Sequence, residues 1–120
     1  MDKYLINARE ELLRHIEALD KVRCAEIIYK PMRKDDRWNV VSYLNYDDRQ
    51  RHIRLKLNYS QDDWEQFLVD LDFFYYAGYG CFSLDGMIWY EDGNWSERGE
   101  YDGSEWWEYC ACPPIPVELS

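Results

Sequence analysis

The stretch "EDGNWSERGEYDGSEWWEYC", Glu91–Cys110, decides the fold because it places two Asp-Gly pairs between short runs of alternating side chains. Asp-Gly favours the tight turns that join antiparallel strands, since glycine adopts the positive φ that such turns require. Asp92-Gly93 and Asp102-Gly103 therefore predict two consecutive hairpins. The same stretch concentrates carboxylates and aromatic rings, and Arg98 is its only basic side chain.

Two-residue turns would fix which side chains lie opposite each other in these hairpins. Tyr90 is then expected opposite Trp95, as a favourable aromatic pair. The pairs expected in the second hairpin are Glu100–Glu105, Arg98–Trp107 and Glu97–Glu108. Two opposed glutamate pairs repel each other, so either internal cations such as Arg54 and Lys56 or an external cationic surface must compensate. The sequence leaves both possibilities open, and three-residue turns would shift the register.

Two segments have the spacing of amphipathic helices. Residues 3–19 place apolar side chains on one stripe, with Asp2 as the expected N-cap. Residues 60–71 repeat the pattern, and Ser60 and Asp63 form a start signal for the second helix. His15 lies beside the first stripe, where we interpret it as a boundary residue rather than a catalytic base.

Three β-like runs, residues 22–30, 38–46 and 51–59, predict an antiparallel meander. In the third run Ile53, Leu55 and Leu57 alternate with basic side chains, so we expect these three residues to face the core. With residues 86–110 as further strands, the fold class is α+β. We expect a single domain over residues 1–120, with an antiparallel sheet of about six strands and two helices, the first packed across one face.

The charge is divided unevenly along the chain. Residues 1–56 contain 13 Lys and Arg against 10 Asp and Glu, whereas residues 57–120 contain 1 against 14, within a net charge of −10. A uniformly acidic surface would be explained by solubility alone, but segregated charge favours a binding role. The acidic half also argues against direct nucleic-acid binding, because phosphate affinity requires clustered cations.

The reactive residue types give no strong signal for an enzyme, a cofactor or a metal site. Cys24, Cys81, Cys110 and Cys112 are expected as free thiols, because the N-terminal residues do not resemble an export signal. Their spacing does not match the paired cysteines of common zinc sites. Paired carboxylates beside tryptophans leave two alternatives open: a small glycosidase-like enzyme, and a carbohydrate or small-ligand binding module.

The C-terminal run "GYGCFSLDGMIWYEDGNWSERGEYDGSEWWEYCACPPIP", Gly78–Pro116, resembles the ending of small acidic proteins carried by phages, prophages and plasmids. The shared pattern is DG-x-W, then EYDGSEWW, then P-x-I-P. The resemblance implies a setting in which small acidic proteins are often similar to anti-CRISPR or anti-restriction inhibitors, several of which imitate DNA. No catalytic or binding residue comes with the resemblance.

These observations together predict a non-enzymatic inhibitor in the bacterial cytoplasm, with no membrane association. Its expected partner is a host nucleic-acid-binding defence protein or complex, which it would block by occupying the place of nucleic acid. The oligomeric state stays open. The residues expected to bind the partner are Glu97, Glu100, Tyr101, Asp102, Glu105, Trp106, Trp107 and Glu108.

Overall fold

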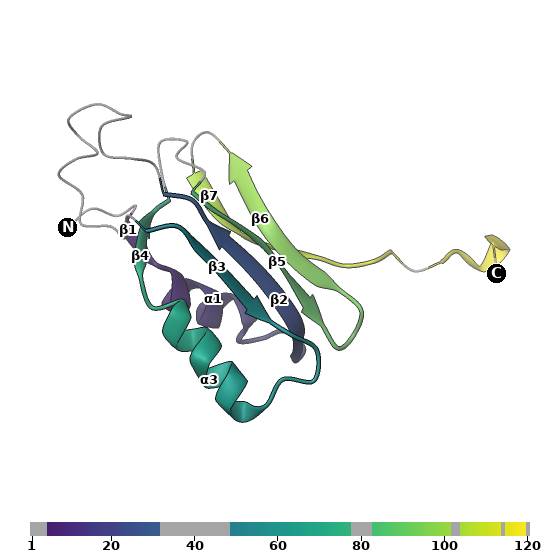
Figure 1. The fold of residues 1–120 in the computed structure, drawn as a ribbon. Helices are drawn as coiled ribbons and strands as arrows, with labels where there is room; N and C mark the ends of the chain where they lie inside the picture. The colour runs from purple at the N-terminus through teal and green to yellow at the C-terminus, as the bar shows by residue number, and fades with distance from the viewer. Residues whose placement is uncertain (1–4, 32–48, 78–82, 102–103, 114, 120) are drawn as a thin grey trace.

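The computed structural model describes residues 5–31, 49–77, 83–101, 104–113 and 115–119, and it confirms the α+β class (Figure 1). The described strands form a five-stranded antiparallel sheet in the order β3-β2-β5-β6-β7 and a separate pair, β1-β4. Counted over these residues there are seven strands, slightly more than predicted. The strands are β1 (Leu5–Asn7), β2 (Val22–Tyr29), β3 (Arg51–Leu55), β4 (Phe74–Tyr76), β5 (Leu84–Tyr90), β6 (Trp95–Tyr101) and β7 (Ser104–Cys110). The helices are α1 (Ala8–Ile16) and α3 (Gln61–Asp70), and a short 3-10 turn, η1 (Val117–Leu119), lies in the C-terminal tail.

The first helix begins later than the sequence predicts. Its N-cap is Asn7, whose side chain accepts the Glu10 N–H at 3.0 Å, and not Asp2. Leu5 belongs instead to β1, which pairs with β4 from Leu5–Tyr76 to Asn7–Phe74. The prediction failed because residues 5–7 pair with β4 as a strand, so the helix begins only after Asn7, whose side chain caps the third helical N–H.

The predicted meander is also wrong in its order. β3 pairs directly with β2, from Ala25–Leu55 to Tyr29–Arg51, and the two strands are antiparallel. The run 38–46, which the sequence places between them, is outside the described residues. Ile53 and Leu55 are buried as expected, whereas Leu57 follows the end of β3 and is 53% exposed.

Helix α3 begins where the sequence predicts. The Ser60 side chain accepts the Asp63 N–H at 3.1 Å, while the Asp63 carboxylate accepts the Ser60 N–H at 3.0 Å. This reciprocal capping box satisfies two N–H groups that the first turn of a helix leaves without partners. Phe67 is buried on the face that α3 turns to the core.

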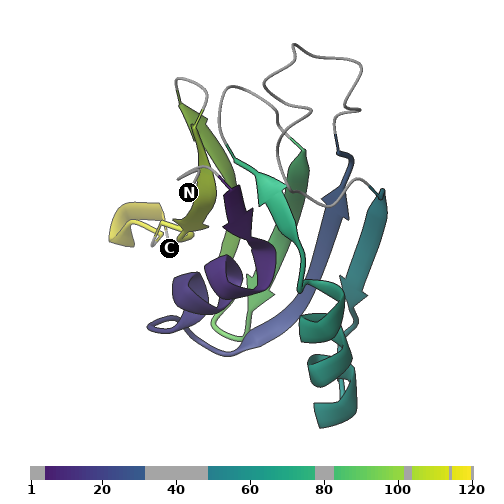
Figure 2. The ribbon, with the colours of Figure 1, turned by 90° about the vertical axis from the view of Figure 1, so that its left-hand side faces the viewer.

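Both helices and the β1-β4 pair cover the same face of the five-stranded sheet (Figure 2). We call this covered side the inner face. Alternate residues of the central strands point into it, because successive side chains of a strand lie on opposite faces. The core side chains of β2, β3 and β5 are Val22, Ala25, Ile27, Tyr29, Ile53, Leu55, Leu84, Ile88 and Tyr90.

The two hairpins have loops of different length. The register of β6 and β7 pairs Tyr101 with Ser104, so the second loop has two residues and the predicted pairs are confirmed. In the first hairpin Trp95 lies opposite Trp89 instead of Tyr90. The Gly93 N–H donates to Tyr90 O at 3.1 Å and Gly93 has φ +88°, which gives a three-residue loop with glycine in the left-handed region.

Within the described residues, neither helix has the length and apolar character needed to cross a lipid bilayer.

The turn assignment can be tested by replacing Gly93 with alanine. A Cβ at this position would meet no atom within 4 Å, so the only cost is the left-handed backbone. Gly93→Ala should lower the free energy of unfolding by about 1–2 kcal/mol in a urea titration. Gly93→Asn should cost less, because asparagine tolerates this conformation. Equal stability of both variants and the parent would contradict the three-residue turn.

Candidate functional site

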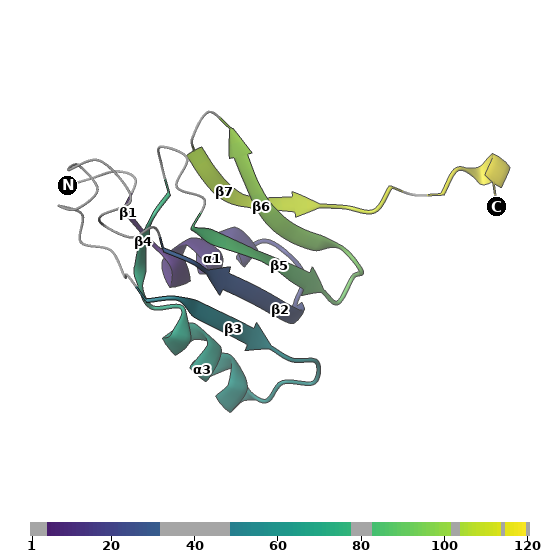
Figure 3. The ribbon, with the colours of Figure 1, turned by 45° about the horizontal axis from the view of Figure 1, so that its top comes forward.

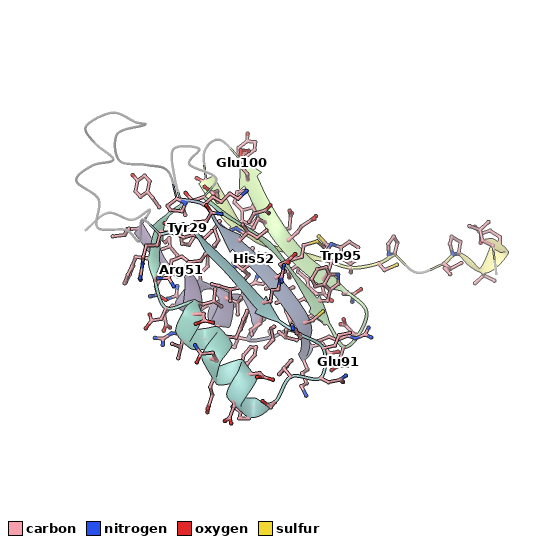
Figure 4. All side chains as sticks on the ribbon, in the orientation of Figure 1. Tyr29, Arg51, His52, Glu91, Trp95 and Glu100 are labelled. Carbon is pink, nitrogen blue, oxygen red and sulfur yellow. The ribbon has the colours of Figure 1, made fainter. Side chains whose placement is uncertain are left out.

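The second face of the five-stranded sheet is not covered by any described helix or strand, and we call it the outer face. Its β5–β7 part, which we call the Trp–Glu face, consists of Trp89, Trp95, Glu97, Tyr101, Trp106 and Glu108. The register places these side chains on one side, since Trp89 opposes Trp95 and Glu97 opposes Glu108. Figure 4 labels Trp95 and Glu100 near the two ends of β6 and His52 on β3.

The aromatic residues of this face are only partly shielded from solvent. Trp89 and Trp106 are each 37% exposed, and Tyr101 is 76% exposed. Trp106 lies across β6, because a Cβ at Gly99 would come within 2.7 Å of the indole Nε1 of Trp106 and 3.0 Å of Glu108 Oε2. Gly99 therefore leaves the space in which the indole and the Glu108 carboxylate lie beside each other.

Glu97 and Glu108 form the repulsive pair that the sequence predicts. Both are exposed, and no ion pair with Lys, Arg or His joins either of them among the described residues. Among the described residues, Glu97 accepts only a weak hydrogen bond, from Cys110 Sγ at 3.4 Å. Cys110 stays a thiol, because burial, followed by the hydrogen bond to Glu97, raises its pKa. The negative charge of this pair is directed to solvent.

The second glutamate pair lies on the inner side of the hairpin, and its members differ. Glu100 is exposed near the end of β6. The Glu105 side chain is only 4% exposed and forms an ion pair with Arg98 at 3.7 Å. Glu105 is therefore neutralised from within and is unsuited to bind a partner, contrary to the prediction.

Trp107 is a second correction to the predicted site. It is 6% exposed, and its ring packs under the Arg98 guanidinium, 5.1 Å from the ring centroid. Tyr101 and Trp106 stay accessible, whereas Asp102 lies outside the described residues. The structure thus brings together Glu97, Tyr101, Trp106 and Glu108, and it adds Trp89 and Trp95.

Arg98 is the centre of a buried group that we call the Arg98 cluster, made of Glu11, Tyr75, Arg98, Glu105 and Trp107. Arg98 donates to Glu11 Oε1 at 3.2 Å and to the Tyr75 hydroxyl at 2.8 Å, and its side chain is 6% exposed. Tyr75 in turn donates to Glu11. Burial raises the pKa of Tyr75, so its hydroxyl keeps the proton that it donates.

Neither cation proposed as an internal partner lies on β6 or β7, since Arg54 is in β3 and Lys56 directly follows that strand. Arg54 Nε donates to Glu26 Oε2 at 3.1 Å, and His52 contacts the same oxygen at 2.8 Å. These residues are on β2 and β3, and β5 separates them from β6 and β7. The internal cation that offsets the negative charge is Arg98 instead. Of the glutamates in the two opposed pairs, it forms an ion pair with Glu105 alone among the described contacts. No sequence signal linked Arg98 to Glu11, which is 87 residues away.

His15 connects α1 to the same part of the inner face. Its Nε2 lies 2.8 Å from the Ser96 hydroxyl, which also contacts the Tyr90 hydroxyl at 2.7 Å. Burial and then the positive charge of Arg98 lower the pKa of His15. The imidazole is therefore held neutral as a structural residue, in agreement with its interpretation as a boundary residue.

Strands β5 and β6 separate beyond the Met87–Glu97 pair, as Figure 3 shows. Two cavities of about 320 and 270 Å³ lie along this separation. Asp85 and Arg98 line both, and Glu97 lines the larger one, which adjoins the Trp–Glu face. Arg98 is already engaged by Glu11, so the carboxylates at the rim favour a cationic group over an anionic one.

The described residues contain no group of three or more His, Cys, Asp or Glu side chains placed to hold a metal ion. Among them Cys24, Cys110 and Cys112 are free thiols. The chain matches no known protein family, and no curated protein or solved structure is significantly similar to it. The described site presents exposed carboxylates and indole rings.

The importance of the Arg98 cluster can be measured by removing its cation. Arg98→Met leaves the Glu11 and Glu105 carboxylates buried without their guanidinium, which should lower the free energy of unfolding by about 3–5 kcal/mol. The triple variant Glu11→Gln/Arg98→Met/Glu105→Gln should recover part of this loss in urea titrations. A loss below about 1 kcal/mol for Arg98→Met would contradict a central role for the cluster.

His15 predicts a dependence of stability on pH. Because the folded state lowers the pKa of His15 below its usual 6.5, the folded state binds the proton less well than the unfolded chain. The stabilisation from neutral His15 should be complete above pH 6.5 and should be lost as the pH falls below it. His15→Gln should therefore show a smaller decrease of Tm between pH 7.5 and pH 5.5, and parallel decreases would refute the assignment.

Proposed function

We propose that the protein is a non-enzymatic binding protein that docks its Trp–Glu face onto the cationic surface of a nucleic-acid-binding protein and blocks access of nucleic acid. The observation that carries this proposal is that the cation of the acidic half is buried, whereas two of its carboxylates are exposed. The single cation of residues 57–120 is buried in the Arg98 cluster, whereas Glu97 and Glu108 are exposed without a described cationic partner. A surface with unmet negative charge is complementary to a cationic one.

The aromatic rings on the same face suit a partner rich in arginine. A guanidinium stacks on an indole ring and at the same time donates hydrogen bonds to a carboxylate. Trp106 and Glu108 lie side by side over Gly99, so one arginine could use both. Tryptophan and arginine are also the residue types that contribute most to protein–protein affinity.

Nucleic-acid-binding proteins are the partner class that this face fits best. Their grooves hold clustered Lys and Arg for phosphates, and carboxylates can occupy phosphate positions. The resemblance of residues 78–116 to proteins of phages and plasmids supports a target among host defence complexes, including those blocked by anti-CRISPR and anti-restriction inhibitors. The proposed site of action is accordingly the bacterial cytoplasm.

A carbohydrate-binding module is the second candidate, because three tryptophans lie on one exposed sheet face. Sugar rings stack on such platforms without requiring net charge. The two functions differ in their response to salt: binding to a cationic groove weakens steeply as salt screens the charges, whereas stacking on sugars does not.

The proposal predicts which variants lose their partner. Immobilised protein exposed to a bacterial lysate should retain nucleic-acid-binding proteins, and duplex DNA or added salt should release them. Glu97→Lys/Glu108→Lys should abolish this retention and leave Tm unchanged or raised, because both side chains are exposed. Gly99→Ala should weaken retention with little change of Tm, because the new methyl displaces the Trp106 indole.

A matched control makes the same change of net charge elsewhere. Glu17→Lys/Glu65→Lys alters exposed residues at the end of α1 and on α3, away from the outer face, and should retain the same proteins as the parent. Equal retention by both double variants would refute the charge argument. Release by free glycans but not by DNA would favour the carbohydrate module instead.

A further inference from the structure

Strand β7 forms one edge of the five-stranded sheet, and no described strand pairs with its free side. Its register with β6 runs from Trp95–Cys110 to Tyr101–Ser104 without a bulge. Edge strands of soluble proteins are usually protected by lysine, proline, bulges or short length. β7 has seven residues and contains neither lysine nor proline. The opposite edge strand, β3, is shorter and carries Arg51, His52 and Arg54.

The main-chain hydrogen bonds of the hairpins establish which groups point to this edge. In an antiparallel strand, successive residues direct their N–H and C=O groups to alternate neighbours. Tyr90 N–H donates to Asn94 O at 2.9 Å, which directs the main-chain groups of Asn94 toward β5. Ser96 then also directs its main-chain groups toward β5, and Glu97 directs its main-chain groups toward β7.

The same alternation continues into β7. Glu97 pairs with Glu108, so Glu108 directs its main-chain groups toward β6. Its neighbours, Trp107 and Tyr109, must direct theirs to the free side of the sheet. Glu105, two residues before Trp107, has the same orientation, and its side chain is held inward by Arg98.

We propose that this edge is a homodimer interface, in which β7 pairs antiparallel with β7 of a second copy about a two-fold axis at Trp107. This register pairs Trp107 with Trp107 of the second copy, and Glu105 with Tyr109 of the second copy. These are the residues whose main-chain groups point outward, so each pair can exchange two hydrogen bonds. A two-fold pairing of identical edges closes after two copies.

The side chains of β7 are self-complementary in this register. On the outer face Trp106 lies opposite Glu108 of the second copy, and Ser104 lies opposite Cys110. On the inner face Glu105 lies opposite Tyr109 of the second copy, a residue that is 38% exposed. No glutamate faces a glutamate across the interface, in contrast to the Glu97–Glu108 pair inside the hairpin. The side chains of Ser104–Cys110 are therefore compatible with antiparallel pairing of β7 with β7 of a second copy.

The net charge of −10 on each copy opposes this association. Added salt screens that repulsion and should strengthen the dimer. The proposed partner complex should respond in the opposite direction, since salt weakens attraction between an acidic and a cationic surface. The response to salt concentration therefore distinguishes the homodimer from the partner complex. A two-fold axis normal to the sheet would also turn both Trp–Glu faces to the same side.

The test is sedimentation equilibrium of the full chain at ~50 mM and ~500 mM NaCl. We expect a shift from 14.7 kDa toward twice that mass, favoured at the higher salt. Amide hydrogen exchange should slow at Trp107 and Tyr109 as the protein concentration rises. A protein that stays monomeric at both salt concentrations up to about 0.5 mM would have a dimer Kd in the millimolar range or weaker. That result would overturn the proposal. Larger open-ended assemblies, or a dimer with unprotected β7 amides, would also overturn it.

Three variants test the register. Trp106→Glu places a carboxylate opposite Glu108 of the second copy at two symmetric positions, and it should raise the dimer Kd at least ten-fold. Trp106→Glu/Glu108→Lys turns both contacts into opposite charges and should restore the dimer. Glu108→Lys alone should dimerise like the parent while losing the cationic partner, so failure of one proposal is distinguishable from failure of the other. A dimer unaffected by Trp106→Glu would refute this register.

Discussion

The buried guanidinium of Arg98 joins the covering layer of α1 and β4 to strands β6 and β7. It joins Glu11 of α1, Tyr75 of β4 and Glu105 of β7, and it packs on the ring of Trp107. A buried charge is costly unless it is paired and hydrogen bonded, so all of these elements must be in place together. The only cation of residues 57–120 is thus committed to the interior.

Strand alternation then determines which carboxylates are left for binding. Glu105 and Glu108 are three residues apart and therefore lie on opposite faces of the sheet. Glu105 turns to Arg98 and becomes structural, whereas Glu108 turns to solvent beside Trp106. The same rule separates Trp106, which is exposed, from Trp107, which belongs to the core. A shift of the hairpin register by one residue would exchange these roles.

The sequence predicts this register correctly for the second hairpin, because a two-residue Asp-Gly loop leaves little freedom. It fails for the first hairpin, because the same dipeptide also fits a three-residue loop in which Gly93 follows a tight turn. Of the predicted partner-binding aromatics, Tyr101 and Trp106 are exposed. The sequence does not separate Trp107 from Trp106, since that requires knowing which face α1 covers. The contact between Glu11 and Arg98 depends on tertiary structure, and no local spacing indicates it.

The distance in sequence between Glu11 and Arg98 has a consequence for how the chain is made. The two residues are 87 positions apart, so the carboxylate of α1 meets its cation only after most of the protein has left the ribosome. Until then α1 has an uncompensated acidic side chain and lacks the sheet face that it later covers. Long-range pairing of this kind slows folding. The contact between α1 and Arg98 can therefore form only after β6 has been synthesised.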